Sequence, residues 1–200
     1  MIGTAQNRSD SVKSERNRMK KIIKALCLVV IILLIYLNIG NLLKIAYKIE
    51  YSDYVNKYSV ENNLDPFLVY AIIKAESNFN AGATSSKGAC GLMQLMDNTA
   101  KEVATIEGID YESGTTLYNP EKNIKIGTKY YSALKSIFKN NEVALAAYNA
   151  GSGNVKKWIN EGIIQPDGSN IENIPFKETN IYVRKILKNY KIYKDLYSLS

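Results

Sequence analysis

Residues 65–77 read DPFLVYAIIKAES, and this stretch decides how the rest of the chain is interpreted. Asp65 suits the N-cap of a helix, and Pro66 suits the first turn, where a missing backbone N–H costs nothing. The apolar run that follows contains no glycine and no further proline to interrupt it. We therefore predict a helix that runs from Asp65 to about Ser77.

Glu76 lies where the helical repeat predicts an apolar residue. Val69, Ile72, Ile73 and Glu76 follow i, i+3, i+4, i+7 spacing. If this face packs inward, burial raises the pKa of the Glu76 carboxyl and leaves a proton available near neutral pH, as a general acid requires. The alternative is that the helix ends here and Glu76 points into water. Glu76 is the first catalytic candidate.

Helical patterns account for most of the remaining domain. Asn119-Pro120 repeats the N-cap and proline signal of residues 65–66. We predict further helices from residue 119 through Phe138, from near Gly91 through Val103, over 142–149 up to a C-terminal cap at Gly151, over 153–160, and from about 177 to 199. Only residues 81–89 and 163–174 leave room for short extended pieces. The predicted fold class is all-α.

The N-terminal part of the chain differs from the rest in charge. Residues 1–24 carry seven Lys and Arg and two acidic residues, a net charge of +5 out of +7 for the whole chain. The high pI therefore describes a basic tail, and the composition does not indicate a nucleic-acid-binding domain.

Residues 25–43 contain no charged side chain, and these nineteen residues are just enough to cross a bilayer core, which needs roughly 20. Basic residues before the span place the N-terminus inside the cell and the rest of the chain outside. We predict a cytoplasmic tail over 1–24, a transmembrane signal-anchor over 25–43, a connector over 44–51 and a folded domain over 52–200. A cleaved signal peptide is the alternative, but the chain has no clean small-x-small cleavage site after the apolar run.

The composition excludes several kinds of chemistry. The chain has no histidine, which removes Ser-His-Asp and Cys-His hydrolases and zinc sites that need imidazole ligands. Cys27 and Cys90 form no metal-binding or disulfide pattern. We predict no metal and no cofactor, so carboxylates, tyrosines and amides must carry any reaction.

Three short segments complete the set of candidates, and each has a structural alternative. Residues 88–94 read GACGLMQ, in which small residues let backbones approach before Met93 and Gln94 begin a helix. Residues 146–151 read AAYNAG and present Tyr148 and Asn149 from a surface of small side chains, which either packs tightly or admits a ligand. Residues 175–179 read PFKET, which also fits an ordinary helix start.

Together with the Glu76 helix, these segments resemble the lytic transglycosylase domain of the soluble lytic transglycosylase family, a lysozyme-like fold related to goose-type lysozyme. The resemblance covers about residues 60–190. It rests on these motifs, in the family's order: Glu76-Ser77, Ser85, Gly88-Ala89-x-Gly91-Leu92-Met93-Gln94, Asn119-Pro120-x-x-Asn123-Ile124-x-x-Gly127, Ala147-Tyr148-Asn149-Ala150-Gly151 and Glu178-Thr179-x-x-Tyr182-Val183. One departure is Asp97, which stands where the family commonly has proline and which we expect to cap the same helix.

The resemblance implies roles for these residues. It makes Glu76 the catalytic acid and base. The residues that it places around the bound sugars are Ser85, Met93, Gln94, Tyr148 and Glu178, to which we add Asn149 and Tyr182 from the matching segments. Glu102, Glu121 and Glu142 lie at positions that look solvated, so the sequence offers no convincing second catalytic carboxylate.

The implied reaction is non-hydrolytic cleavage of the β-1,4 bond between N-acetylmuramic acid and N-acetylglucosamine in peptidoglycan, leaving 1,6-anhydromuramoyl ends without metal, nucleotide or water. Peptidoglycan strands and the membrane are the expected partners. One alternative is a muramidase of the same fold, which would use a second carboxylate to activate water. The other is a wall-binding or assembly protein that has lost turnover.

Overall fold

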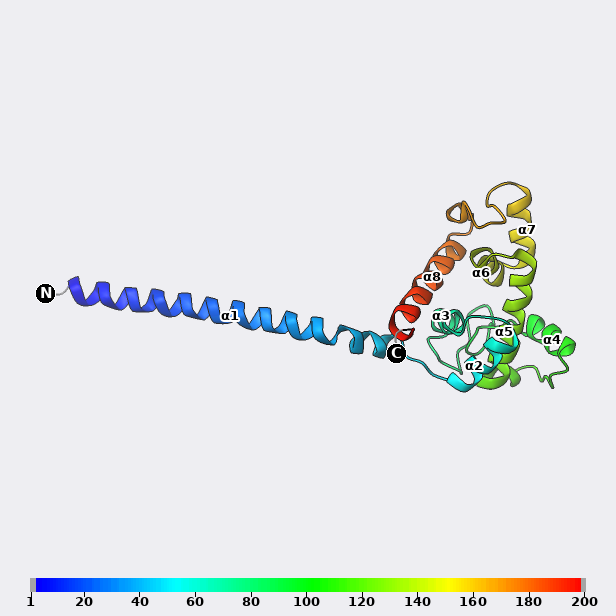
Figure 1. Ribbon diagram of the computed structural model, residues 1–200, viewed down its shortest axis with the longest axis horizontal. Helices are drawn as coiled ribbons and strands as arrows, with labels where there is room; N and C mark the ends of the chain where they lie inside the picture. The colour runs from blue at the N-terminus through cyan, green and yellow to red at the C-terminus, as the bar shows by residue number, and fades with distance from the viewer. Residues whose placement is uncertain (1–2, 199–200) are drawn as a thin grey trace. The chain divides into compact units, whose positions relative to one another are not determined.

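A computed structural model describes the backbone of residues 3–198 and the side chains of residues 15–198. It divides into two units, Met1–Ala46 and Tyr47–Ser200. The first unit holds helix α1, Gly3–Ala46. The second holds α2 (Ser52–Glu61), α3 (Pro66–Glu76), α4 (Asp97–Ile106), η1 (Thr116–Tyr118), α5 (Pro120–Phe138), α6 (Asn141–Ala150), α7 (Ser152–Asn160), η2 (Ile171–Asn173) and α8 (Lys177–Tyr197) (Figure 1).

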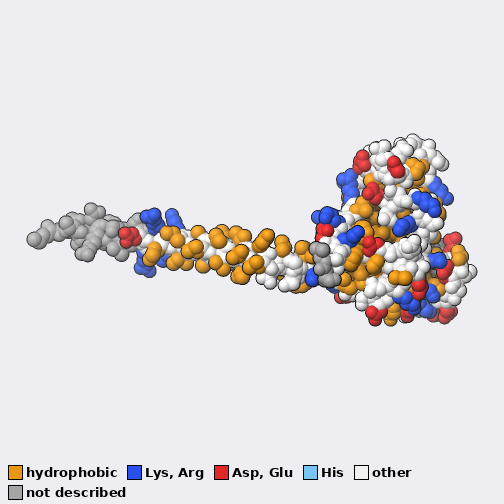
Figure 2. Space-filling view, in the orientation of Figure 1, with side chains coloured by type: hydrophobic (Ala, Val, Ile, Leu, Met, Phe, Trp, Pro, Cys, Tyr) orange, Lys and Arg blue, Asp and Glu red, His pale blue; other side chains and the backbone are white. Residues whose placement is uncertain are grey.

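Helix α1 presents apolar side chains on all sides. Its Leu, Ile and Val side chains between residues 22 and 45 are mostly more than half exposed, and Figure 2 shows them as a hydrophobic surface with basic side chains at its N-terminal end. Glu15–Ala46 is long and apolar enough to cross a membrane, a test that a signal sequence would also pass. A helix that is apolar all round needs an apolar surrounding.

The second unit is built around α3. The predicted inward face is confirmed, since Val69, Ile72 and Ile73 are fully buried. Asp65 caps the helix as predicted, because its Oδ1 accepts a hydrogen bond of 2.9 Å from the backbone N–H of Phe67. Helix α8 packs along α3, and α6 packs against both α5 and α8 (Figure 1).

Several other predicted helix ends are confirmed. Asn119 caps α5 by accepting from the N–H of Lys122 at 3.0 Å. Gly151 ends α6 with a φ of 87°, in the region that glycine adopts without strain. Helices α7 and α8 begin within a residue of the predicted starts. Helix α2 was not predicted as a separate element. Among residues 3–198, β pairing is confined to two isolated bridges, Thr84–Cys90 and Cys90–Leu95, so the domain is all-α as predicted.

The predicted helix from near Gly91 is wrong in its first part. Residues 91–94 form a turn that is closed by the Cys90–Leu95 bridge, and Gln94 in this turn has a φ of 47°. Helix α4 begins only at Asp97, which lies inside the helix and does not cap it. The Asp97 carboxylate instead accepts hydrogen bonds from the hydroxyls of Tyr111, at 2.7 Å, and Ser113. Tertiary hydrogen bonds therefore override helical spacing here.

The segment that leads into the domain is held by the last helix. The hydroxyl of Tyr197 donates to the carbonyl of Tyr47 at 2.8 Å, and that of Tyr193 donates to the carbonyl of Lys48 at 3.1 Å. The rings of Tyr47 and Tyr193 also meet edge to face, with centroids 5.5 Å apart. Residues 47 and 48 of the predicted connector are therefore held in place by α8.

Candidate active site

A pocket of about 470 Å³ opens in the second unit. It is formed where the end of α3, the loop over residues 85–96, the end of α6 and the start of α8 come together. Its lining residues are Glu76, Ser85, Ser86, Lys87, Ala89, Gln94, Met96, Tyr148, Asn149, Ala150, Phe176, Glu178 and Thr179. The structure therefore gathers candidates that are up to about a hundred residues apart in the sequence.

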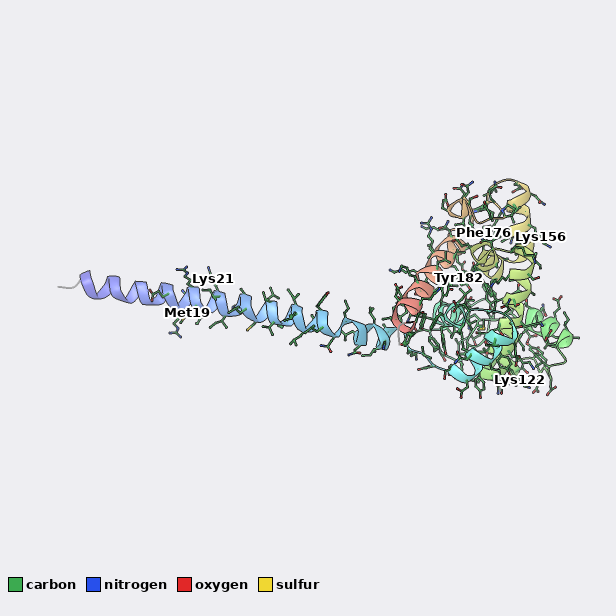
Figure 3. The ribbon with its side chains drawn as sticks, viewed as in Figure 1. Met19, Lys21, Lys122, Lys156, Phe176 and Tyr182 are labelled. Atoms are coloured by element: carbon green, nitrogen blue, oxygen red, sulfur yellow. The ribbon has the colours of Figure 1, made fainter. Side chains whose placement is uncertain are left out.

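Glu76 is the last residue of α3 and contributes its carboxyl to this pocket. The hydroxyl of Tyr182, on α8, donates to Glu76 Oε1 at 2.6 Å (Figure 3 labels Tyr182). Burial raises the pKa of Glu76 from its ordinary value of 4.5 to about 7, although the Tyr182 hydrogen bond and the charge of Lys185 each lower it. A carboxyl in this state can both release and accept a proton near neutral pH.

Lys185 also acts on the end of α3 directly. Its Nζ donates to the carbonyl of Ala75 at 2.9 Å, one residue before Glu76. Tyr182 and Lys185 lie about one turn apart on α8, so a single helix fixes the final turn of α3 at two points. A cation at a helix C-terminus is favourable because the last carbonyls carry partial negative charge.

The loop beside Glu76 is fixed by Asn123, a fully buried residue of α5. Its Oδ1 accepts from the N–H of Met93 at 2.8 Å, and its Nδ2 donates to the carbonyls of Cys90 at 3.1 Å and Leu117 at 2.8 Å. Gly91 packs against the same amide, since a Cβ at Gly91 would lie 2.2 Å from Asn123 Nδ2 and 2.0 Å from the Leu117 carbonyl oxygen. The motif glycine thus makes room for the amide that holds the loop.

Met93 does not line the pocket. Its side chain is fully buried, and its sulfur lies 2.4 Å from where a Cβ would stand at Gly127. Its carbonyl accepts a hydrogen bond of 2.7 Å from the hydroxyl of Tyr148, which does line the pocket. Met93 therefore connects the core of the domain to a pocket tyrosine.

Gln94 and Ser85 line the pocket with polar groups. The Nε2 of Gln94 donates to the carbonyls of Gly91, at 2.9 Å, and Ala83, at 3.2 Å, which fixes the amide in the loop. The Oγ of Ser85 accepts from the N–H of Ala89 at 3.0 Å. Both side chains keep hydrogen-bonding capacity, an acceptor on Gln94 and a donor on Ser85.

The start of α8 contributes the other side of the pocket. Glu178 and Lys87 both line the pocket and form an ion pair of 3.2 Å, in which each side chain is more than 70% exposed. Asn149 accepts a hydrogen bond of 2.7 Å from the hydroxyl of Thr179. Tyr182 is nearly buried and reaches the pocket only through Glu76.

The profile of the transglycosylase SLT domain matches residues 53–167. The chain belongs to this family. Soluble lytic murein transglycosylase from Salmonella typhimurium is 37% identical over 144 residues, which cover 70% of this chain and 22% of that protein. Membrane-bound lytic murein transglycosylase C from Edwardsiella ictaluri is 36% identical over 116 residues, which cover 53% of this chain and 32% of that protein.

Solved structures of the transglycosylase SLT family have the same fold. An inactive glutamate-to-glutamine mutant of lytic transglycosylase Slt from Pseudomonas aeruginosa is 37% identical, with a TM-score of 0.71 over 76% of this chain and 25% of that one. A complex of the 70-kDa soluble lytic transglycosylase with bulgecin A is 35% identical, with a TM-score of 0.71 and the same coverage. The chain spans about a fifth to a third of the length of the curated relatives it matches.

Some pocket residues of this SLT domain were not among the sequence candidates. Lys87, Met96, Phe176 and Thr179 line the pocket, and Lys185 contacts the end of α3. Phe176 and Thr179 are close to Glu178 in the PFKET motif, so the motif could have indicated them. Nothing in the sequence distinguishes Lys87 and Lys185 from other surface lysines. Within residues 15–198, no three acidic or cysteine side chains are grouped closely enough to hold a metal ion.

Proposed function

We propose that this chain is a membrane-anchored lytic transglycosylase that cleaves the β-1,4 bond between N-acetylmuramic acid and N-acetylglucosamine in peptidoglycan. The observation that carries the proposal is the Glu76 carboxyl, which lies in the pocket, is held by Tyr182 and has a pKa raised to about 7. The relatives are named murein transglycosylases, and one related structure is an inactive glutamate-to-glutamine mutant.

The proposed reaction uses Glu76 twice. The protonated carboxyl gives its proton to the glycosidic oxygen as the bond from that oxygen to the muramoyl anomeric carbon breaks, and the muramoyl N-acetyl group stabilises the positive charge on that carbon. The carboxylate then takes the proton of the muramoyl C6 hydroxyl, whose oxygen closes onto the anomeric carbon. One carboxyl therefore suffices, no water is consumed, and the product ends in 1,6-anhydromuramic acid.

The other candidates receive binding or positioning roles in this proposal. The Tyr148 hydroxyl, which α6 contributes to the same pocket as Glu76, contacts the N-acetyl group. Gln94, Ser85, Asn149 and Glu178 offer hydrogen bonds to the sugars, as their place in the pocket lining suggests. We assign Met93 and Tyr182 to positioning, since Met93 orients Tyr148 and Tyr182 orients Glu76.

The proposed anchor is the apolar part of α1. We propose the domain organisation predicted from the sequence, with a cytoplasmic basic tail over 1–24, a span over 25–43, a connector over 44–51 and an extracytoplasmic domain over 52–200. The apolar surface of α1 and a relative named as membrane-bound support membrane association. The basic residues before the span support the orientation.

A muramidase of the same fold is the second candidate, because Glu178 places another carboxylate in the pocket. In a hydrolase that carboxylate would activate water on the opposite face of the sugar. Against this role, Glu178 is largely exposed and paired with Lys87. A wall-binding protein without turnover is the third candidate, and the retained Glu76 argues against it.

Mass spectrometry of digested peptidoglycan tests the proposal. The full chain in detergent is incubated with purified peptidoglycan beside the Glu76→Gln variant, which keeps the size of the side chain but cannot supply a carboxylic proton. We expect products that end in anhydromuramic acid, lighter by one water than hydrolytic products, and none from the variant. Reducing muramic ends would instead support the muramidase, and Glu178→Gln would then test the second carboxylate.

A further inference from the structure

Phe176 is an aromatic side chain left open on the wall of a polar pocket. It is 48% exposed and lines the pocket, immediately before α8 (Figure 3). The other large apolar side chain in the pocket wall is Met96, which is 46% exposed. Most of the remaining lining side chains can form hydrogen bonds. Apolar surface inside a pocket that is otherwise lined by polar groups is the usual composition of a ligand site.

A buried tryptophan supports the Phe176 ring. The rings of Trp158, on α7, and Phe176 lie nearly perpendicular, at 87°, with centroids 5.0 Å apart. Trp158 is only 4% exposed, so it is a fixed partner in the core. Edge-to-face packing of this kind favours one orientation of the exposed ring. The Phe176 ring is therefore fixed in one orientation, with its exposed surface in the pocket.

Phe176 lies in the same pocket as Glu76, close to other residues of the candidate site. Glu178 follows two residues later, and Thr179 hydrogen-bonds Asn149 across the same pocket. A pyranose ring with equatorial substituents carries C–H groups on its faces and hydroxyl or amide groups around its edge. A flat apolar surface surrounded by hydrogen-bonding groups matches both parts of such a ring.

We propose that Phe176 forms a sugar subsite of this pocket, in which the face of an N-acetylhexosamine ring of the glycan strand stacks on the phenyl ring. This inference rests on the proposed function, because it takes the same glycan as the ligand. Phe176 contacts the substrate and contributes binding energy, while Trp158 keeps the ring in place. Met96 contributes further apolar contact.

Calorimetric titration with a β-1,4-linked N-acetylglucosamine tetramer tests this subsite. The measurements use the full chain in detergent and the Glu76→Gln background, so that the ligand is not consumed. We expect Phe176→Ala to weaken binding about tenfold. Phe176→Leu, which keeps apolar bulk but loses the flat face, should weaken it similarly, whereas Phe176→Tyr should stay within about twofold.

The chain supplies a matched control and a built-in reporter. Ile181 lies on α8, is 54% exposed and does not line the pocket, so Ile181→Ala should bind like the parent. Trp158 is the single tryptophan of the chain, so tetramer binding against Phe176 should change its fluorescence in a saturable way. Circular dichroism of each variant shows whether the fold is retained, and the leucine variant carries the test if the alanine variant does not fold.

The outcomes separate the subsite from the reaction. Unchanged affinity in Phe176→Leu or Phe176→Ala, or no tetramer binding by the parent, would overturn the subsite even if anhydromuramoyl products form. Normal Phe176-dependent binding without such products from the wild-type chain would leave the subsite standing and refute the proposed transglycosylase reaction.

Discussion

The hydroxyl of Tyr182 lies 2.6 Å from Oε1 of Glu76, although 106 residues separate the two in the sequence. The hydrogen bond favours the ionised carboxylate, and burial favours the protonated carboxyl. Burial is the larger effect, and the two together leave the pKa of Glu76 at about 7. The last helix of the domain therefore helps to set the protonation state of the residue at the end of α3.

Activity should fall as the pH rises through about 7, because Glu76 must be protonated to donate to the leaving oxygen. Tyr182→Phe removes a hydrogen bond that lowers the pKa of Glu76, so this alkaline limb should move to higher pH. We also expect kcat to fall about tenfold, since the carboxyl loses its positioning partner. The pH dependence of kcat/KM for both proteins checks this, and an unmoved limb would contradict it.

Lys185→Met should also move the alkaline limb of the pH–activity profile to higher pH, and it does so without removing a side chain that lines the pocket. The charge of Lys185 lowers the pKa of Glu76, and its hydrogen bond holds the carbonyl of Ala75. Lys188→Met, at another exposed position of α8, is the matched control and should leave the pH profile unchanged. If both variants shift the limb equally, the effect is one of net charge and not of this contact.

Glu76→Gln should stabilise the domain at alkaline pH. In the unfolded chain Glu76 ionises near 4.5, and in the folded domain near 7, so between these values the unfolded state binds fewer protons and stability falls as the pH rises. Glutamine avoids this cost, which amounts to at most about 3 kcal/mol above pH 7.

Urea unfolding at pH 4 and pH 8 measures this difference. The variant and the wild type should be equally stable at pH 4, and the variant should gain stability at pH 8. Glu102→Gln, an exposed residue of α4, controls for the change in net charge. A gain that is the same at both pH values would show that Glu76 is not held in the protonated form by burial.

Gly91→Ala should be far more destabilising than Gly88→Ala. Both glycines have positive φ, 77° and 82°, so both substitutions strain the backbone by about 1 kcal/mol. A Cβ at Gly91 would also collide with Asn123 and the Leu117 carbonyl, whereas nothing lies within 4 Å of one at Gly88. We expect a loss above about 3 kcal/mol for Gly91→Ala, measured by denaturant unfolding. Equal losses would contradict the packing of Asn123.

The sequence predicts well those features that depend on neighbouring residues. The caps at Asp65 and Asn119 and the inward face of α3 follow from local chemistry, and the structure confirms them. The membership of Glu76, Tyr148 and Glu178 in one pocket followed only from a resemblance to a family, because periodicity contains no information on which helices meet.

The errors arise where distant residues decide the local conformation. Gln94 adopts a positive φ because Asn123 and Cys90 organise the loop around it, although the spacing of residues 92–103 favours a helix. Asp97 is the first residue of α4, after the N-cap residue Met96, and its carboxylate accepts a hydrogen bond from Tyr111 instead of capping the helix. The sequence also could not predict that Lys185 lies near Glu76, because nothing distinguishes it from the other exposed lysines of α8.

Two hydrogen bonds join the start of the second unit to its last helix. The hydroxyl of Tyr193 donates to the carbonyl of Lys48, and that of Tyr197 donates to the carbonyl of Tyr47. Trimming the chain before Tyr193 would therefore free residues 47 and 48 as well as shorten α8. Loss of these contacts would destabilise α8 as far as Tyr182 and Lys185. Truncation at the end of α8 would therefore disturb the Glu76 carboxyl at the end of α3.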